Sequence, residues 1–166
     1  MIISPTFPIM DGVSFRQIEP VNADDPKGLT YEWCKGIPGM QVTCCLRNAG
    51  KISGNHYHRG DDPSKNPERM LILSGSCDLI TCDGTQTVVH FLRQPPLEII
   101  IQPSILHAFL PKENINFLEY RATVFNPENN DTFPAESFVE YLKNKCRPIN
   151  REAILSYQRH ISQFIS

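Results

Sequence analysis

The sequence lacks several features that would assign it at once to a class of protein. No apolar run approaches the roughly 18–20 residues of a membrane span, and the N-terminus has neither the basic region nor the long apolar stretch of a secretion signal. The formal net charge is only −2, so no basic excess indicates nucleic-acid binding. These absences predict a cytoplasmic protein with no nucleic-acid partner and no membrane contact.

The cysteines also lack a recognisable pattern. There are six, with no Cys-x-x-C pair and no zinc-finger spacing, and a chain of 166 residues does not need disulfides for stability. Cys44 and Cys45 are adjacent in a strand-like run, so their side chains are expected on opposite faces. We expect most of the cysteines to pack as small apolar side chains, with the alternative that one of them lines a pocket.

Turn-forming residues, in contrast, are abundant. The 14 prolines and 9 glycines are spread along the chain, which is typical of short elements joined by many turns. Asp83 and Gly84 lie between two β-rich runs and indicate a two-residue hairpin turn. About seven strand-like segments follow one another at the spacing of an antiparallel sandwich or barrel; they are residues 40–46, 69–73, 77–81, 86–92, 97–101, 106–110 and 116–125. The sequence therefore predicts an all-β fold.

The two ends of the chain differ from this middle part. Residues 1–35 contain several turn signals and are predicted to form an N-terminal arm with one or two strands, followed by a barrel over residues 36–134. Residues 135–166 show apolar residues at helical spacing, interrupted at Pro148, after which Asn150 can cap a second helix. We expect a single domain whose two short C-terminal helices cover the core or, alternatively, form a dimer contact.

Histidines carry the clearest chemical signal. His56 and His58 are one residue apart in a strand-like segment, so both side chains project to the same face. Glu68 opens the next strand-like run, and His107 follows a turn at Pro103. Three imidazoles and one carboxylate suit a divalent ion such as zinc, iron, nickel, manganese or copper. Each residue alone also has a simpler interpretation as a solvated or structural side chain.

The joint spacing resembles the signature of the cupins. The first cupin motif is matched by Gly50, His56, His58, Glu68 and Gly75, and the looser second motif by Pro103 and His107. This resemblance implies a double-stranded β-helix, or jelly-roll, barrel with a divalent metal ion held by His56, His58, Glu68 and His107.

One segment departs from the cupin pattern. Residues 59–67 form a longer connection between His58 and Glu68 than the pattern has. This polar segment is either a flap that contacts substrate or a lengthened hairpin. Its length also leaves open that Asp61 or Asp62, in place of Glu68, reaches the metal.

Longer segments resemble particular cupins. Residues 54–58 (Gly-Asn-His-Tyr-His) and 125–133 are similar to segments in the C-terminal cupin domain of bacterial capsular-polysaccharide sugar-nucleotide enzymes, and residues 73–78 to a segment of nucleotide-sugar 3,4-ketoisomerases. The resemblance implies a small-molecule substrate, a homodimer, and epimerisation beside a keto group. The reductase activity of the capsular enzymes does not carry over, because this chain has no Gly-x-Gly-x-x-Gly motif.

The implied reaction needs a base beside the metal. Tyr57 is a poor candidate, since it faces away from the two histidines in a regular strand. Glu119 and Tyr120 alternate faces on the last barrel strand, so one of them is expected to point inward as a catalytic residue. The candidate cations for contact with a substrate phosphate are Arg47, Lys51 and Arg59. Each of them also has a simpler interpretation as an ordinary surface charge.

Three functions are consistent with these residues. The first is a metal-dependent isomerase or epimerase that acts on a sugar nucleotide or a related carbohydrate. The second is an iron-dependent dioxygenase, because the same ligand set serves oxygen chemistry in other cupins. The third is a non-catalytic cupin that binds a small molecule. Fold alone does not choose among them.

Overall fold

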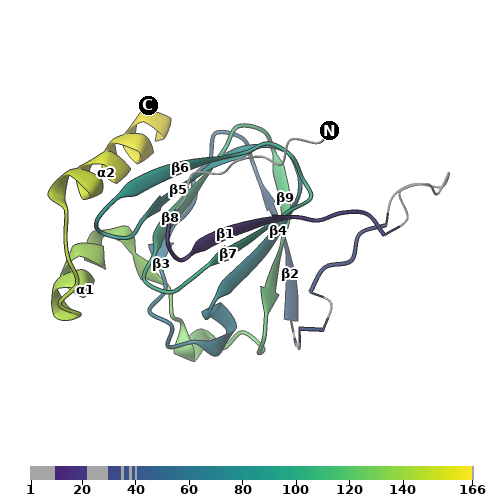
Figure 1. The fold of residues 1–166 in the computed structure, drawn as a ribbon, viewed down its shortest axis with the longest axis horizontal. Coiled ribbons are helices and arrows are strands. Elements are labelled where there is room, and N and C mark those ends of the chain that lie inside the picture. The colour runs from purple at the N-terminus through teal and green to yellow at the C-terminus, as the bar shows by residue number, and fades with distance from the viewer. Residues whose placement is uncertain (1–9, 22–29, 35, 38, 40, 166) are drawn as a thin grey trace.

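Two antiparallel five-stranded sheets face each other and enclose the core, as the computed structural model shows (Figure 1). It describes residues 10–21, 30–34, 36, 37, 39 and 41–165. The first sheet has the order β1-β7-β4-β9-β2, and the second has the order β10-β3-β8-β5-β6. The strands are β1 (Val13–Gln17), β2 (Gln41–Arg47), β3 (Ser53–Tyr57), β4 (Glu68–Ser74), β5 (Cys77–Cys82), β6 (Thr87–Leu92), β7 (Leu97–Ile101), β8 (Leu106–Pro111), β9 (Ile115–Arg121) and β10 (Phe133–Pro134). The predicted all-β jelly-roll fold is confirmed.

Alternation along the strands builds the core between the sheets. In β2, for example, Cys45 is buried and Cys44 is exposed, as their adjacency predicts. The apolar side chains that point inward from both sheets form one cluster; its buried members include Met70, Ile72, Leu79, Leu97, Ile99, Ile101, Phe109, Ile115 and Phe117.

Helices cover the outer face of the second sheet. Helices α1 (Phe138–Asn144) and α2 (Arg151–Ile165) lie together at one side of the barrel (Figure 1). Phe138, Tyr141 and Leu142 pack against the sheet in a second apolar cluster. The Asn150 side chain accepts a hydrogen bond from the Glu152 amide at 3.0 Å and so caps α2. Both predicted C-terminal helices are therefore present, and they cover a core.

Local details differ from the expectations. The turn between β5 and β6 has four residues, 83–86, because the Asp83 carboxylate accepts hydrogen bonds from the amides of Thr85 and Gln86. Strand β10 has only two residues, too few for a periodic signal. Within the predicted N-terminal arm, β1 pairs with β7, whereas residues 1–9, 22–29 and 35 lie outside the described part of the chain.

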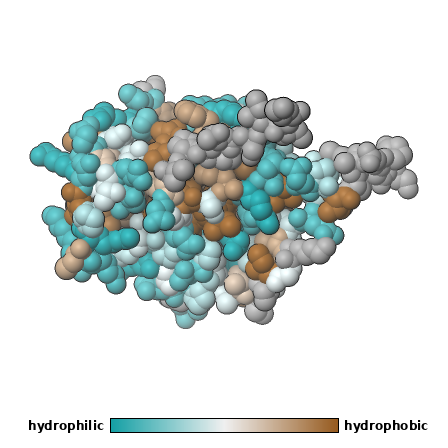
Figure 2. Space-filling model, viewed as in Figure 1, coloured by the Kyte–Doolittle hydropathy of each residue, from teal (hydrophilic) through white to brown (hydrophobic). Residues whose placement is uncertain are grey.

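The outer surface is mixed in character. The face in Figure 2 is mainly hydrophilic over the helices at its left, and hydrophobic residues gather toward its middle. No helix among the described residues is both long and apolar enough to cross a membrane.

Candidate metal centre

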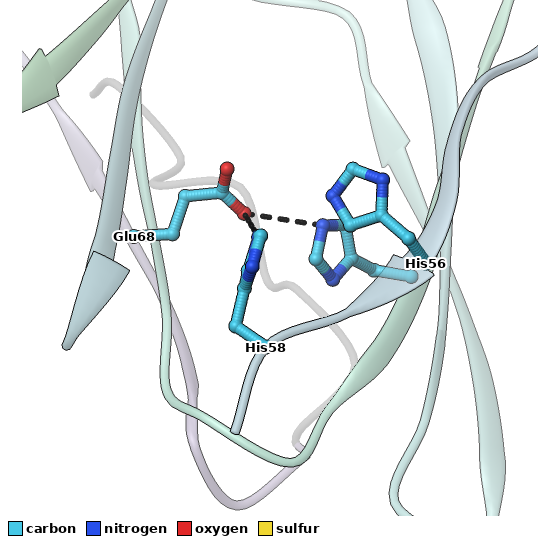
Figure 3. A group of neighbouring side chains, drawn as sticks. His56, His58 and Glu68 are labelled. Carbon is cyan, nitrogen blue, oxygen red and sulfur yellow. Dashed lines mark ion pairs between the residues drawn. The ribbon is translucent and has the colours of Figure 1, made fainter. Parts of the chain in front are cut away.

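The four predicted ligands meet inside the barrel. His56 lies on β3, His58 directly follows it, Glu68 begins β4 and His107 lies on β8. One ligand atom from each lies within 4.8 Å of the others, so the two sheets bring the four residues into one group. Figure 3 shows His56 near the end of β3 and His58 on the coil just after it, with the His58 ring beside the Glu68 carboxylate.

A local irregularity in β3 aims the histidines. The register with β8 shifts between Gly54 and His56, which places His56 opposite His107. Gly54 has a φ of +86°, and a Cβ there would lie 3.2 Å from the His107 carbonyl oxygen, so a glycine suits this close approach. Tyr57 faces the opposite way and is fully buried in the cluster beneath the helices, as predicted.

Backbone carbonyls fix the orientation of two rings. Nδ1 of His58 donates to the Asp131 carbonyl oxygen, and Nδ1 of His107 donates to the Ile105 carbonyl oxygen at 3.0 Å. Because a carbonyl only accepts, each ring carries a proton on Nδ1 and turns Nε2 toward the centre. This arrangement of outer hydrogen bonds is the one that typically orients a metal-binding histidine.

The carboxylate of Glu68 sits between these rings. Its Oε2 lies 3.1 Å from Nε2 of His107 and 3.4 Å from Nε2 of His58. Burial alone would raise the pKa of Glu68, but the positive charge of Lys65 and the contacts with the two histidines hold that pKa well below its usual range. Glu68 is therefore ionised and available as an anionic ligand.

The histidines themselves differ in protonation. Burial, followed by the charge of His107, lowers the pKa of His56 to about 3, so His56 is neutral near pH 7. Burial also disfavours the charged form of His58, but the contact with Glu68 and its negative charge outweigh this and raise the pKa of His58. A neutral imidazole beside an ionised carboxylate is a suitable donor set for a divalent cation.

Sequence reasoning missed a buried lysine in the group. Lys65 ends a 3₁₀ turn, Pro63–Lys65, within the long connection between the ligands. Its Nζ contacts Oε1 of Glu68 and lies 2.5 Å from Oε1 of Glu119, and its side chain is only 7% exposed. A lysine in a polar segment is typical of a solvated surface, so no signal in the sequence marks it.

The structure separates the two candidates for a catalytic residue on β9. Glu119 points inward and contacts Lys65 and, at 2.8 Å, Arg121. Tyr120 points to the other face, where its ring meets that of Trp33 edge-on with centroids 6.1 Å apart. Because side chains alternate along a strand, only Glu119 is brought toward the histidines.

Asp62 also takes a structural role. Its carboxylate caps the 3₁₀ turn through the amide and hydroxyl of Ser64 and lies 3.6 Å from Arg121. Asp61 is exposed, and its amide is bound by Asp131. Among the described residues, the carboxylate that joins the three histidines is therefore that of Glu68.

The other predicted polar residues lie at the edge of the site or outside it. Arg47 donates to the Ser53 hydroxyl at 2.8 Å, and Lys51 is exposed. Arg59 stacks over the Phe133 ring, 3.6 Å from its centroid. His90, a histidine that neither cupin motif includes, is buried in β6 and hydrogen-bonds the Thr81 hydroxyl at 2.9 Å, apart from the group of four.

No protein-family model and no curated protein sequence matches the chain. Solved structures do, and those with the same cupin-type barrel include a sugar 3,4-ketoisomerase and a dTDP-6-deoxy-D-glucose-3,5-epimerase. A sugar 3,4-ketoisomerase from Thermoanaerobacterium thermosaccharolyticum, in complex with TDP, is 14% identical, covers 82% of this chain and 98% of its own, and has a TM-score of 0.64.

Two further structures are similar. A dTDP-6-deoxy-D-glucose-3,5-epimerase from Legionella pneumophila, in complex with dTDP-4-keto-L-rhamnose, is 18% identical over 75% of this chain and 74% of its own, with a TM-score of 0.54. The capsular polysaccharide assembling protein of Staphylococcus aureus is 20% identical over 66% of this chain but only 30% of its own, with a TM-score of 0.50. At these identities the likeness establishes a shared fold, in agreement with the resemblances in the sequence.

Proposed function

We propose that this protein is a metal-dependent isomerase or epimerase that moves a proton beside the keto group of a sugar nucleotide. One observation carries the proposal: three imidazoles and a carboxylate converge inside the barrel with their ligand atoms within 4.8 Å of one another. The shared fold supports the substrate class, because structures with this barrel include a ketoisomerase in complex with TDP and an epimerase in complex with a dTDP-keto sugar.

The residues present fit a divalent ion. Nε2 of His56 is buried without a hydrogen-bond partner, and Nε2 of His58 and Oε2 of Glu68 have no partner beyond their contacts with each other and with His107. Leaving a buried polar atom unsatisfied costs about 1–3 kcal/mol, and a cation bound at these atoms would remove that cost. His56, His58, Glu68 and His107 would hold zinc, iron, nickel or manganese. Such an ion, when bound, supplies Lewis-acid stabilisation of negative charge on a carbonyl oxygen.

Glu119 is the proposed proton-transfer residue. It lies on the inner face of β9, its side chain is 16% exposed, and Lys65 and Arg121 hold it from two sides. A carboxylate fixed in this way can accept the proton on the carbon next to a substrate keto group. In an isomerase it returns that proton to the former carbonyl carbon, and the hydroxyl proton of the first carbon moves to the former carbonyl oxygen. In an epimerase a second donor on the opposite face of the sugar returns a proton to the same carbon.

A homodimer is part of the proposal. Among the described residues, β2 is one of the two edge strands of the first sheet, and Val42 and Leu46 on its outer face are 58% and 71% exposed. An unpaired strand edge with apolar side chains is typical of a surface that a second chain covers. Sedimentation equilibrium tests this: the wild-type chain is expected to be dimeric, Leu46→Asp is expected to shift it toward monomer, and a monomeric wild type contradicts it.

Metal analysis tests the ligand set directly. Protein purified without added metal is expected to contain about one divalent ion per chain, and the His56→Ala/His58→Ala variant is expected to contain none. His160→Ala on helix α2 is the matched control, because it removes a histidine outside the group and should leave the metal content unchanged. A wild-type protein without stoichiometric metal would contradict the metal-dependent mechanism and favour the non-catalytic binding module.

A solvent-exchange experiment tests the reaction. Incubation with dTDP-4-keto-L-rhamnose in deuterated water is expected to place deuterium on carbon beside the keto group, without consuming oxygen. The structure of the product then separates an isomerase from an epimerase. Oxygen uptake that depends on bound iron would indicate the dioxygenase, and binding without exchange would indicate the binding module.

A further inference from the structure

Asp131, just before β10, holds the start of the segment 59–67. Its side chain is buried, with the residue only 3% exposed. Oδ1 accepts a hydrogen bond from the Arg59 amide at 2.8 Å. Oδ2 accepts hydrogen bonds from three further amides; these belong to Gly60 at 2.8 Å, Asp61 at 2.9 Å and Asp62 at 3.2 Å. One buried carboxylate thus satisfies four consecutive backbone donors.

The same residue also orients a metal-site histidine. The main-chain carbonyl oxygen of Asp131 accepts the Nδ1 proton of His58, which directly precedes the bound amides. Asp131 therefore holds the imidazole and the start of the segment at the same time. Displacing this residue would disturb both.

The far end of the segment reaches the site through Lys65. Asp62 caps the turn that carries Lys65, and Arg121 ties Ser64 to β9 with a 3.0 Å hydrogen bond. Lys65 then lies between Glu68 and Glu119. Because the turn begins at Asp62, whose amide Asp131 binds, the position of the lysine depends on that first group of hydrogen bonds.

We propose that Asp131 is a positioning residue that makes the segment 59–67 a fixed wall of the site and not a flap. It orients His58 through its carbonyl oxygen and, through its carboxylate, places Lys65 between the ligand Glu68 and the proton-transfer residue Glu119. That this wall borders a catalytic site rests on the proposed function, whereas the fixed segment is a property of the fold. No neutral side chain of the same size replaces Asp131, because an amide has one acceptor oxygen and turns an NH₂ group toward backbone donors.

Limited digestion with trypsin tests the fixed segment without any assay of activity. Trypsin cleaves after Arg59 and Lys65, both inside it. Asp131→Ala removes the acceptor of four backbone amides and leaves them unsatisfied, which favours local opening of the segment. We therefore expect Asp131→Ala to speed cleavage at these two positions at least about tenfold, and Asp131→Asn to speed it less. Glu128→Ala is the matched control, since Glu128 is exposed and lies in the same connection.

General unfolding is separated from local release by cleavage elsewhere. Sites in the helices, after Lys143 and Arg159, report loss of the whole fold and should be cut at the wild-type rate in the Asn variant. If Asp131→Ala is cut equally fast at all four positions, the whole fold is lost and Asp131→Asn then provides the test. Cleavage of Asp131→Asn after Arg59 and Lys65 at the wild-type rate would overturn the proposal. Faster cleavage at these two positions alone would support it.

Turnover measurements connect the segment to the reaction. Asp131→Asn is expected to lower kcat about 10- to 100-fold with KM changed less than about threefold, because the change misplaces groups around the reacting centre. Lys65→Met should lower kcat similarly while Arg59 stays protected from trypsin. A change in KM alone would contradict the positioning role.

The two proposals fail in different ways. If even the wild-type protein exchanges no substrate proton, but the Asp131 variants expose Arg59 and Lys65, the proposed function is wrong and the fixed segment stands. If the wild type is active and both Asp131 variants resist trypsin and retain kcat, the positioning role is wrong and the proposed function stands.

Discussion

The two ends of the barrel interior have opposite chemistry, although strands β4, β8 and β9 contribute to both. The polar end contains His56, His58, Lys65, Glu68, His107 and Glu119. The apolar end contains Ile72, Cys77, Leu79, Leu97, Phe109, Ile115 and Phe117. On β9, apolar Phe117 and charged Glu119 are two residues apart. On β8, His107 of the polar end and Phe109 of the apolar end are also two residues apart. A single step along the inner face of a strand thus separates core from site.

The energetics of the two ends differ accordingly. Each square ångström of apolar surface buried at the apolar end stabilises the fold by about 25 cal/mol. Burying charges costs free energy, and a buried ion pair such as Lys65–Glu68 roughly breaks even with an apolar pair of the same size. The polar end therefore contributes little to stability, and its presence agrees with the proposed binding of a metal ion and a substrate.

The largest expected effect is on turnover at the polar end. Glu119→Gln removes the proposed proton acceptor while keeping its size, and we expect kcat to fall about 100- to 10,000-fold. Kinetics with the sugar-nucleotide substrate would measure this. Tyr120→Phe is the matched control on the same strand, because its side chain faces the outside of the barrel. Equal losses in both variants would contradict the assignment of the polar end as the site.

The next effect is on stability at the apolar end. Leu97 is 1% exposed and lies beside Ile72, four residues along β4 from Glu68. Leu97→Ala is expected to lower the free energy of unfolding by about 2–5 kcal/mol, measured by urea denaturation. Turnover per folded molecule should stay near the wild-type value. A large loss of turnover with unchanged stability would show that the two ends are not separate in function.

The sequence predicts the two ends unequally. The fold class was predictable because strand alternation is a local pattern, and the grouping of His56, His58, Glu68 and His107 was predictable because their spacing resembles the cupin motifs. To predict that Glu119 and not Tyr120 points inward, one must know the register of β9 against β4. A shift of that register by one residue exchanges the two faces, and the sequence alone does not determine it.

Lys65 and Asp131 were not predictable. Their roles depend on contacts between distant parts of the chain: Asp131 binds amides about 70 positions away, and Lys65 meets Glu119 across the barrel. In the sequence both are ordinary polar residues of turns. Long-range polar contacts of this kind have no periodicity, so composition and spacing do not reveal them.

The smallest expected effect is on the reactivity of cysteines. Cys77 is fully buried at the apolar end, and burial raises the pKa of its thiol to about 12, whereas Cys44 and Cys146 are exposed. Because the thiolate is the reactive form, iodoacetamide at pH 8 should label Cys44 and Cys146 first and Cys77 barely, as read by peptide mass spectrometry. Leu97→Ala should speed labelling of Cys77 by loosening its surroundings, whereas Glu119→Gln should not. Faster labelling of Cys77 in Glu119→Gln as well would mean that packing at the apolar end depends on the charges at the polar end.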